Sequence, residues 1–242
     1  MNGSMYKYTS YATLKGWGSV GLSGNLVNNG YMIADGYGQE RSLDLSSFGN
    51  VFNTIDNDMY DLSGNNDAYY GKGETGWFAV NSANLVLPLI TVNTGAGAYN
   101  WGESSGDTDI DLINSIRLDF ANVTVGDSLA ISLLADDRSE VSDSVGNILG
   151  IWKLAAPSLA FTTVDITVRY DDVMAATQGI FEGNIKLFRR DGWRADWVDI
   201  TASVNTVTKV ITAANVNALG TLAVGKDIAL KPPPRGTIFL ME

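Results

Sequence analysis

The sequence predicts an all-β protein in two parts: a short N-terminal region of stacked parallel strands, followed by an antiparallel β-sandwich. Three observations support this prediction. Short apolar runs recur between Gly, Asn and Asp residues along most of the chain. The first hundred residues contain a weak internal repeat. Only one segment, 171–178, has helical character, and hydrophobic residues make up 45% of the 242 residues, which is enough for a core.

The repeat lies in residues 1–97 and predicts a parallel β-solenoid. Each unit places short apolar strands between Asn and Gly residues, which suit tight corners where φ is often positive. An antiparallel array of hairpins would use the same residues, and the sequence leaves both arrangements open. Either way the outer strands have open edges, which predicts pairing with the rest of the chain or, in a homo-oligomer, with another subunit. The repeated segments are 24–28 with 49–53, 31–35 with 77–81, and 43–45 with 85–87.

A polar, Gly-rich and aromatic insertion at 57–76 interrupts the second repeat unit. Long loops on rigid scaffolds commonly carry function, and a plain surface loop is the alternative.

From residue 98 the strands lengthen and the turns become charged, which predicts a self-sufficient β-sandwich over 98–242. Asp171 or Asp172 is expected to cap a short helix that ends at Gly179. The pair Asp191-Gly192 between two apolar runs predicts a hairpin. The chain closes with a stiff Pro-rich tail. The expected strands are 115–120, 128–135, 160–170, 185–189, 197–201, 207–212 and 219–224.

Composition excludes several classes of function. The chain has no His and no Cys, so Ser-His-Asp and Cys-His nucleophilic catalysis, disulfides, and zinc sites built on imidazole or thiolate are excluded. The formal net charge of −11 argues against a nucleic-acid partner, because phosphate binding needs clustered Lys and Arg. No apolar run is long enough for a transmembrane helix. The first residues do not form a signal peptide, so export implies a leader outside this chain.

Several short motifs resemble bacterial surface proteins of the PEP-CTERM (exosortase-sorted) and autotransporter-like families. Residues 28–36 (NNGYMIADG) and 43–45 (LDL) resemble their repeat rungs, and 185–193 (IKLFRRDGW) with 197–201 (WVDIT) resembles a module that often closes them. The resemblance implies an immunoglobulin-like sandwich and an extracellular or cell-surface location. It implies no catalytic residues. The usual sorting tail, with its Val-Pro-Glu-Pro motif and apolar span, does not occur in this chain.

Alternating acids predict a calcium site. Asp107, Asp109 and Asp111 would lie on one side of an extended segment, and Ca²⁺ prefers such oxygen ligands. A solvated linker between the two parts is the alternative. No cofactor is required otherwise.

Carboxylates at strand ends suggest a second function, a glycoside hydrolase. Such an enzyme needs a general acid paired with a nucleophile or a base, and both are carboxyl groups. Strand-end turns and a helix cap would use the same residues. The candidates are Glu103, Asp136, Asp137 and Asp171, with Asp107, Asp109 and Asp172 as further options.

Tryptophans supply candidate contacts to carbohydrate, because aromatic faces stack on sugar rings. Core packing is the alternative for each of them. The candidates are Trp77, Trp101, Trp193 and Trp197. Together the sequence favours an exported bacterial surface module with a structural or adhesive task, and leaves the glycoside hydrolase as the alternative.

Overall fold

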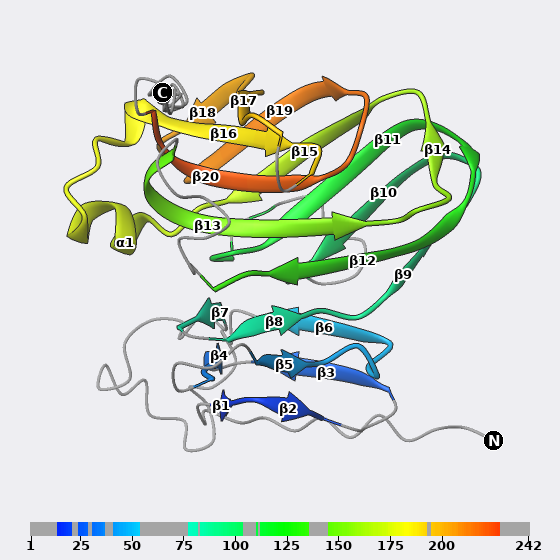
Figure 1. Ribbon diagram of the computed structural model, residues 1–242, viewed down its shortest axis with the longest axis horizontal. Helices are drawn as coiled ribbons and strands as arrows, with labels where there is room; N and C mark the ends of the chain where they lie inside the picture. Colours follow the sequence, from blue (N-terminus) through cyan, green and yellow to red (C-terminus); the bar gives the residue numbers. More distant parts are fainter. Residues whose placement is uncertain are drawn as a thin grey trace, which may run out of the picture.

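The computed structural model describes residues 14–20, 24–28, 31–36, 41–53, 77–81, 83–103, 110, 112–135, 145–192 and 195–227. These residues are predominantly β, with one α-helix, α1 (Asp172–Thr177). Figure 1 shows two regions, which we call the parallel stack (β1–β8, residues 14–86) and the antiparallel body (β9–β20, residues 90–227).

The parallel stack consists of short strands that pair in parallel, in three ladders. One ladder joins β1, β4 and β7, a second joins β2, β5 and β8, and a third joins β3 and β6. We call β1, β2 and β3 the first rung; it lies farthest from the body (Figure 1). The strands are β1 (Leu14–Gly16), β2 (Gly18–Ser19), β3 (Asn25–Asn28), β4 (Tyr31–Ala34), β5 (Ser42–Asp44), β6 (Asn50–Asn53), β7 (Trp77–Val80) and β8 (Asn84–Val86).

The internal repeat of the sequence coincides with the pairing register of these ladders. Asn25 lies opposite Asn50, Tyr31 opposite Trp77, and Leu43 opposite Leu85. Equivalent residues of successive repeats therefore stack on one another, so inward apolar side chains form columns. Leu43 and Leu85 are 3% and 0% exposed in one such column.

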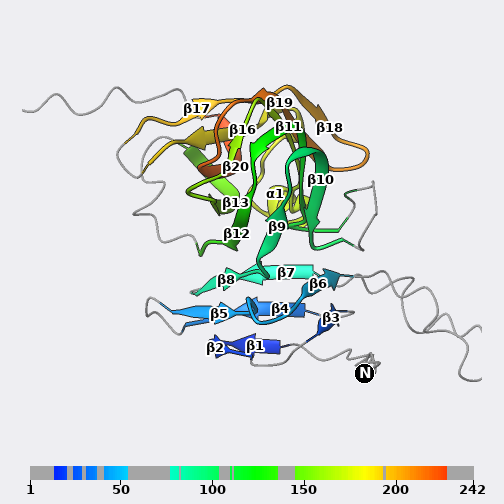
Figure 2. The same cartoon turned by 90° about the vertical axis from the view of Figure 1, so that its right-hand side faces the viewer.

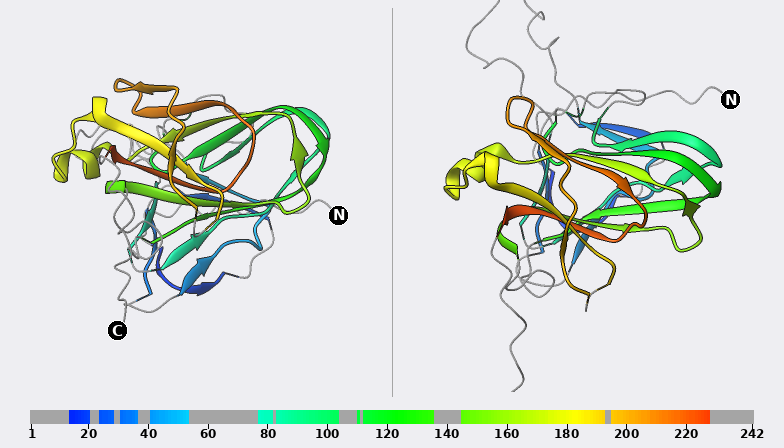
Figure 3. Two further views of the ribbon diagram at one scale, coloured as in Figure 1. Left: turned by 45° about the horizontal axis from the view of Figure 1, so that its top comes forward. Right: turned by 90° about the horizontal axis from the view of Figure 1, so that it is seen from above.

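The antiparallel body has two facing sheets. One has the order β10-β11-β15-β19-β18, with β14 paired to β11; the other contains β17-β16-β20-β13-β12, with β9 paired to β12 (Figure 3). The strands are β9 (Ile90–Val92), β10 (Gly95–Trp101), β11 (Ile116–Val125), β12 (Asp127–Leu133), β13 (Val145–Ala155), β14 (Ala160–Phe161), β15 (Val164–Arg169), β16 (Ile185–Arg190), β17 (Val198–Asp199), β18 (Ser203–Asn205), β19 (Val210–Val216) and β20 (Thr221–Asp227); a 3-10 helix, η1 (Glu182–Asn184), precedes β16.

The stack and the body share one sheet. Strand β12 pairs antiparallel with β8 and with β9, so a nine-stranded sheet runs from β17 in the body to β2 at the far end of the stack. We call the contact between β12 and the strands β8 and β9 the seam; Figure 2 shows the stack directly below the body at this contact. The main apolar core is also continuous across the seam, because it contains Leu43 and Leu85 of the stack together with Leu133 of the body.

A second, smaller cluster covers the outer face of the body. Ile151, Ala223 and Phe188 are neighbours in register on β13, β20 and β16. Trp197, which follows the turn after β16, packs against this row and is 6% exposed. The predicted hairpin near Asp191-Gly192 is confirmed, since β16 pairs antiparallel with β17.

The helix is also confirmed, with Asp171 as its N-cap and Gly179 at a φ of 66° just beyond its end. Two elements differ from the expectation. Strand β10 crosses the expected domain boundary between 97 and 98 and pairs with β11. Strand β13 was not predicted, because Gly146, Asn147 and Gly150 suggest a loop; register shifts at these residues and a φ of 43° at Asn147 let the strand accommodate them.

Among the described residues, α1 is the only α-helix, and it is not long enough to cross a membrane.

Candidate functional site

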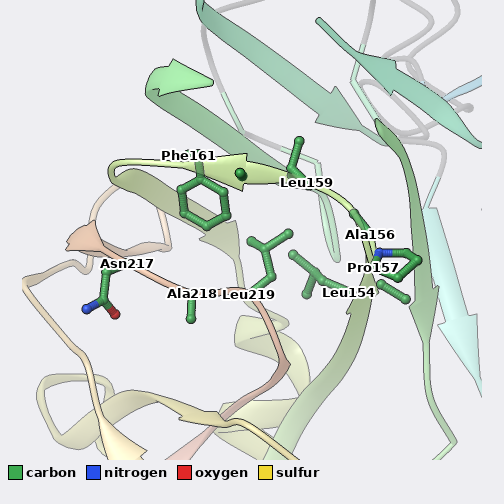
Figure 4. Close-up of a pocket in the computed structure, with 10 residues that line it drawn as sticks. Leu154, Ala156, Pro157, Leu159, Phe161, Asn217, Ala218 and Leu219 are labelled. Carbon is green, nitrogen blue, oxygen red and sulfur yellow. The ribbon is translucent and has the colours of Figure 1, made fainter. Parts of the chain in front are cut away.

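A cleft of about 560 Å³ opens beside β14. Figure 1 shows β14 at the end of the body away from α1. The walls of the cleft are the turn from β13 to β14 on one side and the loop from β19 to β20 on the other (Figure 4). Pro157, Leu159 and Phe161 come from the first wall, and Asn217 and Leu219 come from the second. The cleft forms here because both segments leave their sheets at this end and only β14, with two residues, pairs back onto β11.

Hydrogen bonds brace both walls. The Asp127 carboxylate accepts from the backbone N–H of Ser158 at 2.8 Å, which fixes the turn before β14. The Arg189 guanidinium donates to the carbonyl oxygen of Ala218 at 2.7 Å, which fixes the opposite loop. Between them the Leu154 N–H donates to the Gly220 oxygen at 3.1 Å. The cleft is therefore preformed.

The lining defines what the cleft can accept. Phe161 is held edge-on against Phe120, with ring centroids 5.1 Å apart, so its ring position is set by the core. Most of the other lining side chains are aliphatic, and Asn217 supplies an exposed amide. A preformed apolar cleft with a few polar groups is the usual form of a site for a small ligand or for one group of a larger ligand.

A second cluster of functional groups lies at the opposite end, beside α1. The Tyr170 hydroxyl donates to Glu182 Oε2 at 2.6 Å, and Lys209 Nζ donates to Glu182 Oε1 at 2.7 Å. Arg169 pairs with Asp172 at 3.0 Å. These contacts tie η1, the start of α1 and the turn between β18 and β19 together, so the cluster has a clear structural task.

The same contacts shift two pKa values. Hydrogen bonds from Lys209 and then from Tyr170 lower the pKa of Glu182 below its usual value of 4.5. Burial, followed by the hydrogen bond to Glu182, raises the pKa of Tyr170. Perturbed groups often mark functional sites, but ion-pair networks in structural positions perturb pKa values as well.

The Glu182 shift predicts a pH-dependent contribution to stability. Because the pKa is lower in the folded chain, the unfolded chain binds more protons in acid, so the stabilisation is complete at neutral pH and is lost as pH falls below about 4.5. We expect Glu182→Gln to lower the urea midpoint at pH 7, and the difference from the wild type to shrink at pH 3. Asp191→Asn, at an ion pair whose carboxylate is 56% exposed, is the control and should show little difference at either pH. A difference for Glu182→Gln that is equal at both pH values contradicts this account.

Three of the candidate catalytic carboxylates lie among the described residues, and all have structural partners; Asp172 pairs with Arg169, as described above. Glu103 is 2% exposed and accepts from the backbone N–H of Leu112 at 2.8 Å. Asp171 accepts from the backbone N–H of Met174 at 2.8 Å as the N-cap of α1. None of the three lines the cleft.

The capping role of Asp171 predicts different effects for removing its hydrogen-bond acceptor and for removing its charge. Asp171→Ala should lower the free energy of unfolding by about 1 kcal/mol, because it removes the acceptor for a free N–H of the first helical turn, whereas Asp171→Asn should retain most of the stability. Chemical denaturation of both variants measures this. Equal losses for alanine and asparagine would show that the charge, and not the cap, is what matters.

The predicted sugar-stacking tryptophans are buried where the structure describes them. Trp101 is 1% exposed and its Nε1–H donates to the Pro88 oxygen at 3.1 Å. Trp197 lies under the Arg190 guanidinium, 4.7 Å from the ring centroid. Both rings are therefore core side chains in this structure and offer no free face. Trp77 lies on β7.

The remaining predicted site residues lie outside the described residues. They are Trp193, Asp136 and Asp137 for the sugar-binding and catalytic roles, and Asp107, Asp109 and Asp111 for calcium. Among the residues that are described, no group of three or more acids is gathered as metal ligands would be.

Sequence reasoning did not identify the cleft or the exposed aromatic at the other end of the molecule. The cleft joins 154–161 to 217–219, and no local pattern signals that contact. Trp17 is 51% exposed on the first rung, with the Arg41 guanidinium 3.8 Å from its ring centroid. The Gly16-Trp17-Gly18 setting was the only available signal, since flanking glycines are typical of a corner.

Comparison of the chain with protein-family models, with curated proteins and with solved structures gave no match.

Proposed function

We propose that this chain is a non-catalytic structural and adhesive module of the bacterial cell surface, in which the body closes one end of a β-solenoid. The observation that carries the proposal is the seam. Strand β12 covers the edge of β8 by antiparallel pairing, at Ser132 opposite Val86 and Leu133 opposite Leu85. A stack of parallel strands needs a cap at each end, because an uncovered end exposes both backbone groups and the apolar interior.

The parallel ladders support the solenoid part of the proposal. Their strands are three or four residues long except for β2, which has two, and the repeats pair in register, as successive rungs of a solenoid would. For the body, the two facing antiparallel sheets agree with the immunoglobulin-like sandwich that the sequence resemblance implies. A stiff stack joined to a sandwich by one sheet suits a task that holds a binding surface away from the cell.

Export and a surface location rest on composition and resemblance. The net charge of −11 and the absence of Cys are both compatible with an exported bacterial protein. The motifs at 28–36, 185–193 and 197–201 resemble surface proteins.

For the adhesive contact we favour the cleft between 154–161 and 217–219. Phe161 and the aliphatic lining suit the methyl or acetyl group of a deoxy or N-acetylated sugar, and the Asn217 amide can bond a neighbouring hydroxyl or amide. This assigns carbohydrate as the ligand class.

Binding of the labelled full chain to an array of immobilised oligosaccharides tests the adhesive proposal. We expect retention on N-acetylated or deoxy sugars, and loss of retention in Ala218→Trp, which fills the cleft. Val207→Trp is the matched control, because Val207 is 86% exposed on the turn at the other end of the body. Both variants are checked by thermal unfolding. Retention that survives Ala218→Trp places the contact elsewhere, and no retention on any sugar removes carbohydrate from the proposal.

A turnover assay distinguishes the non-catalytic module from the alternative function, a glycoside hydrolase. Incubation with a panel of nitrophenyl glycosides should release no nitrophenol. The non-catalytic proposal would be contradicted if nitrophenol were released and if this release were abolished by Asp→Asn at position 136, 137 or 171, or by Glu103→Gln.

Calcium contact at Asp107, Asp109 and Asp111 is a separate part of the proposal. A ligand that binds only the folded chain raises its thermal midpoint. We expect a higher midpoint with millimolar Ca²⁺ than with chelator, and no such shift when the three acids are replaced by Asn. An unchanged midpoint in the wild type removes calcium.

A further inference from the structure

Among the described residues, no strand covers the interior of the parallel stack at the first rung. Leu14 lies opposite Met32 in the ladder of β1 and β4, so the two side chains share an inward column. Met32 is 4% exposed, but Leu14 is 39% exposed. The same occurs in the ladder of β3 and β6, where Val51 is 1% exposed and its partner Leu26 is only partly buried. Leu14 and Leu26 are therefore more exposed than their partners because, among the described residues, no further strand continues their columns at this end.

The backbone edges at this end are also open. Among the described residues, β1, β2 and β3 each pair on one side only, and β2 is the last strand of the nine-stranded sheet. Val20 donates its N–H to the Asp44 oxygen on β5, so the N–H of Ser19, the alternate residue, faces away from the sheet. Such an edge accepts another strand readily.

We propose that a second copy of this chain covers the first rung, and that two chains form a closed two-fold dimer through it. Among the described residues, the other end of the stack lies against the body, where β12 pairs with β8 (Figure 2). The two copies then meet through their first rungs. A two-fold axis perpendicular to the plane of this sheet reverses strand direction, so β2 pairs antiparallel with β2 of the partner subunit, and the contact closes without forming filaments.

The surface chemistry fits a self-complementary contact. Leu14 and Trp17 are exposed apolar side chains on the first rung. The nearby charges are already partnered, since Lys15 pairs with Asp35 at 3.0 Å and Arg41 lies over Trp17. The two subunits therefore contact each other through apolar side chains and through the outward-facing backbone groups of β2. Because each chain carries a net charge of −11, mutual repulsion weakens the dimer at low salt, and added salt strengthens it.

Light scattering on the full chain after size exclusion, across a wide concentration range, tests the proposal. We expect twice the 25.9 kDa of one chain, with dissociation favoured by low salt. Leu14→Lys puts a charge in the exposed column, and Ser19→Pro removes the outward N–H while the bond from Val20 to β5 remains. Each should halve the mass. Val198→Lys, at a residue 54% exposed on β17 at the opposite edge of the same sheet, is the control and should leave the dimer intact.

Circular dichroism checks that each variant folds. Leu14→Lys and Ser19→Pro act independently, so if one of them misfolds, the other still tests the proposal. A single-chain mass at every concentration overturns the proposal. So does a dimer that survives both Leu14→Lys and Ser19→Pro, a dimer that Val198→Lys dissociates, or an assembly that grows beyond two chains. None of these outcomes depends on sugar binding, so the dimer and the adhesive function fail separately.

Discussion

Leu85→Ala is expected to lower the free energy of unfolding by about 2–5 kcal/mol. Leu85 is 0% exposed and lies on β8, opposite Leu43 on one side and opposite Leu133 on the other. It is therefore packed in the stack and in the seam at once. Alanine leaves a cavity that neither neighbour can fill without leaving its own strand. Urea denaturation of the variant and the wild type measures the loss.

Leu89→Ala is the matched control, four residues along the chain. Leu89 is 53% exposed, so the same chemical change should alter stability by no more than about 0.5 kcal/mol. A loss for Leu85→Ala as small as that for Leu89→Ala would contradict a tightly packed seam.

Gly126→Ala is expected to lower the free energy of unfolding by about 1–3 kcal/mol. Gly126 joins β11 to β12, and a Cβ there would lie 2.5 Å from the Val92 carbonyl oxygen on β9. The atom it meets belongs to the backbone, so relief requires β9 to move away from β12. The change therefore acts on the seam without removing any contact. Thermal and urea unfolding give the expected loss.

Gly192→Ala is the control for this substitution. A Cβ at Gly192 meets no atom within 4 Å, so stability should stay within about 0.5 kcal/mol of the wild type. If Gly126→Ala is equally neutral, β9 and β12 are not in close contact.

The sequence allowed good predictions wherever the pattern was local or repeated. The alternation of apolar residues between Asn and Gly gave the correct correspondence of Tyr31 with Trp77 and of Leu43 with Leu85, because repeated units that stack in parallel must pair equivalent residues. The helix cap at Asp171 was also predictable, since a cap is decided within four residues.

Contacts between distant segments were not predictable in the same way. Strand β13 contains Asn147 at positive φ and two register shifts, and these features make a strand look like a loop when its partners on β12 and β20 are unknown. The cleft likewise depends on how the turn before β14 lies against the loop before β20.

The role of each tryptophan also depends on distant packing. Trp101 and Trp17 both follow polar or Gly-rich residues, yet the first is 1% and the second 51% exposed. Trp101 is the last residue of β10 and its Nε1–H donates to the Pro88 oxygen, whereas Trp17 lies on the rung that nothing else among the described residues covers. The glycines on both sides of Trp17 are typical of a corner, but they do not determine whether another segment covers its ring.

The central claim is that one sheet and one core join the parallel stack to the antiparallel body. Hydrogen exchange followed by mass spectrometry on the full chain tests it most directly, because exchange reports the free energy needed to open each strand. We expect the amides of β5 and β8 to be protected to the same extent as those of β12 and β13, and Leu85→Ala to weaken protection in both regions. Rapid exchange in β5 and β8 beside slow exchange in β13 would contradict the claim, since the stack would then open independently of the body.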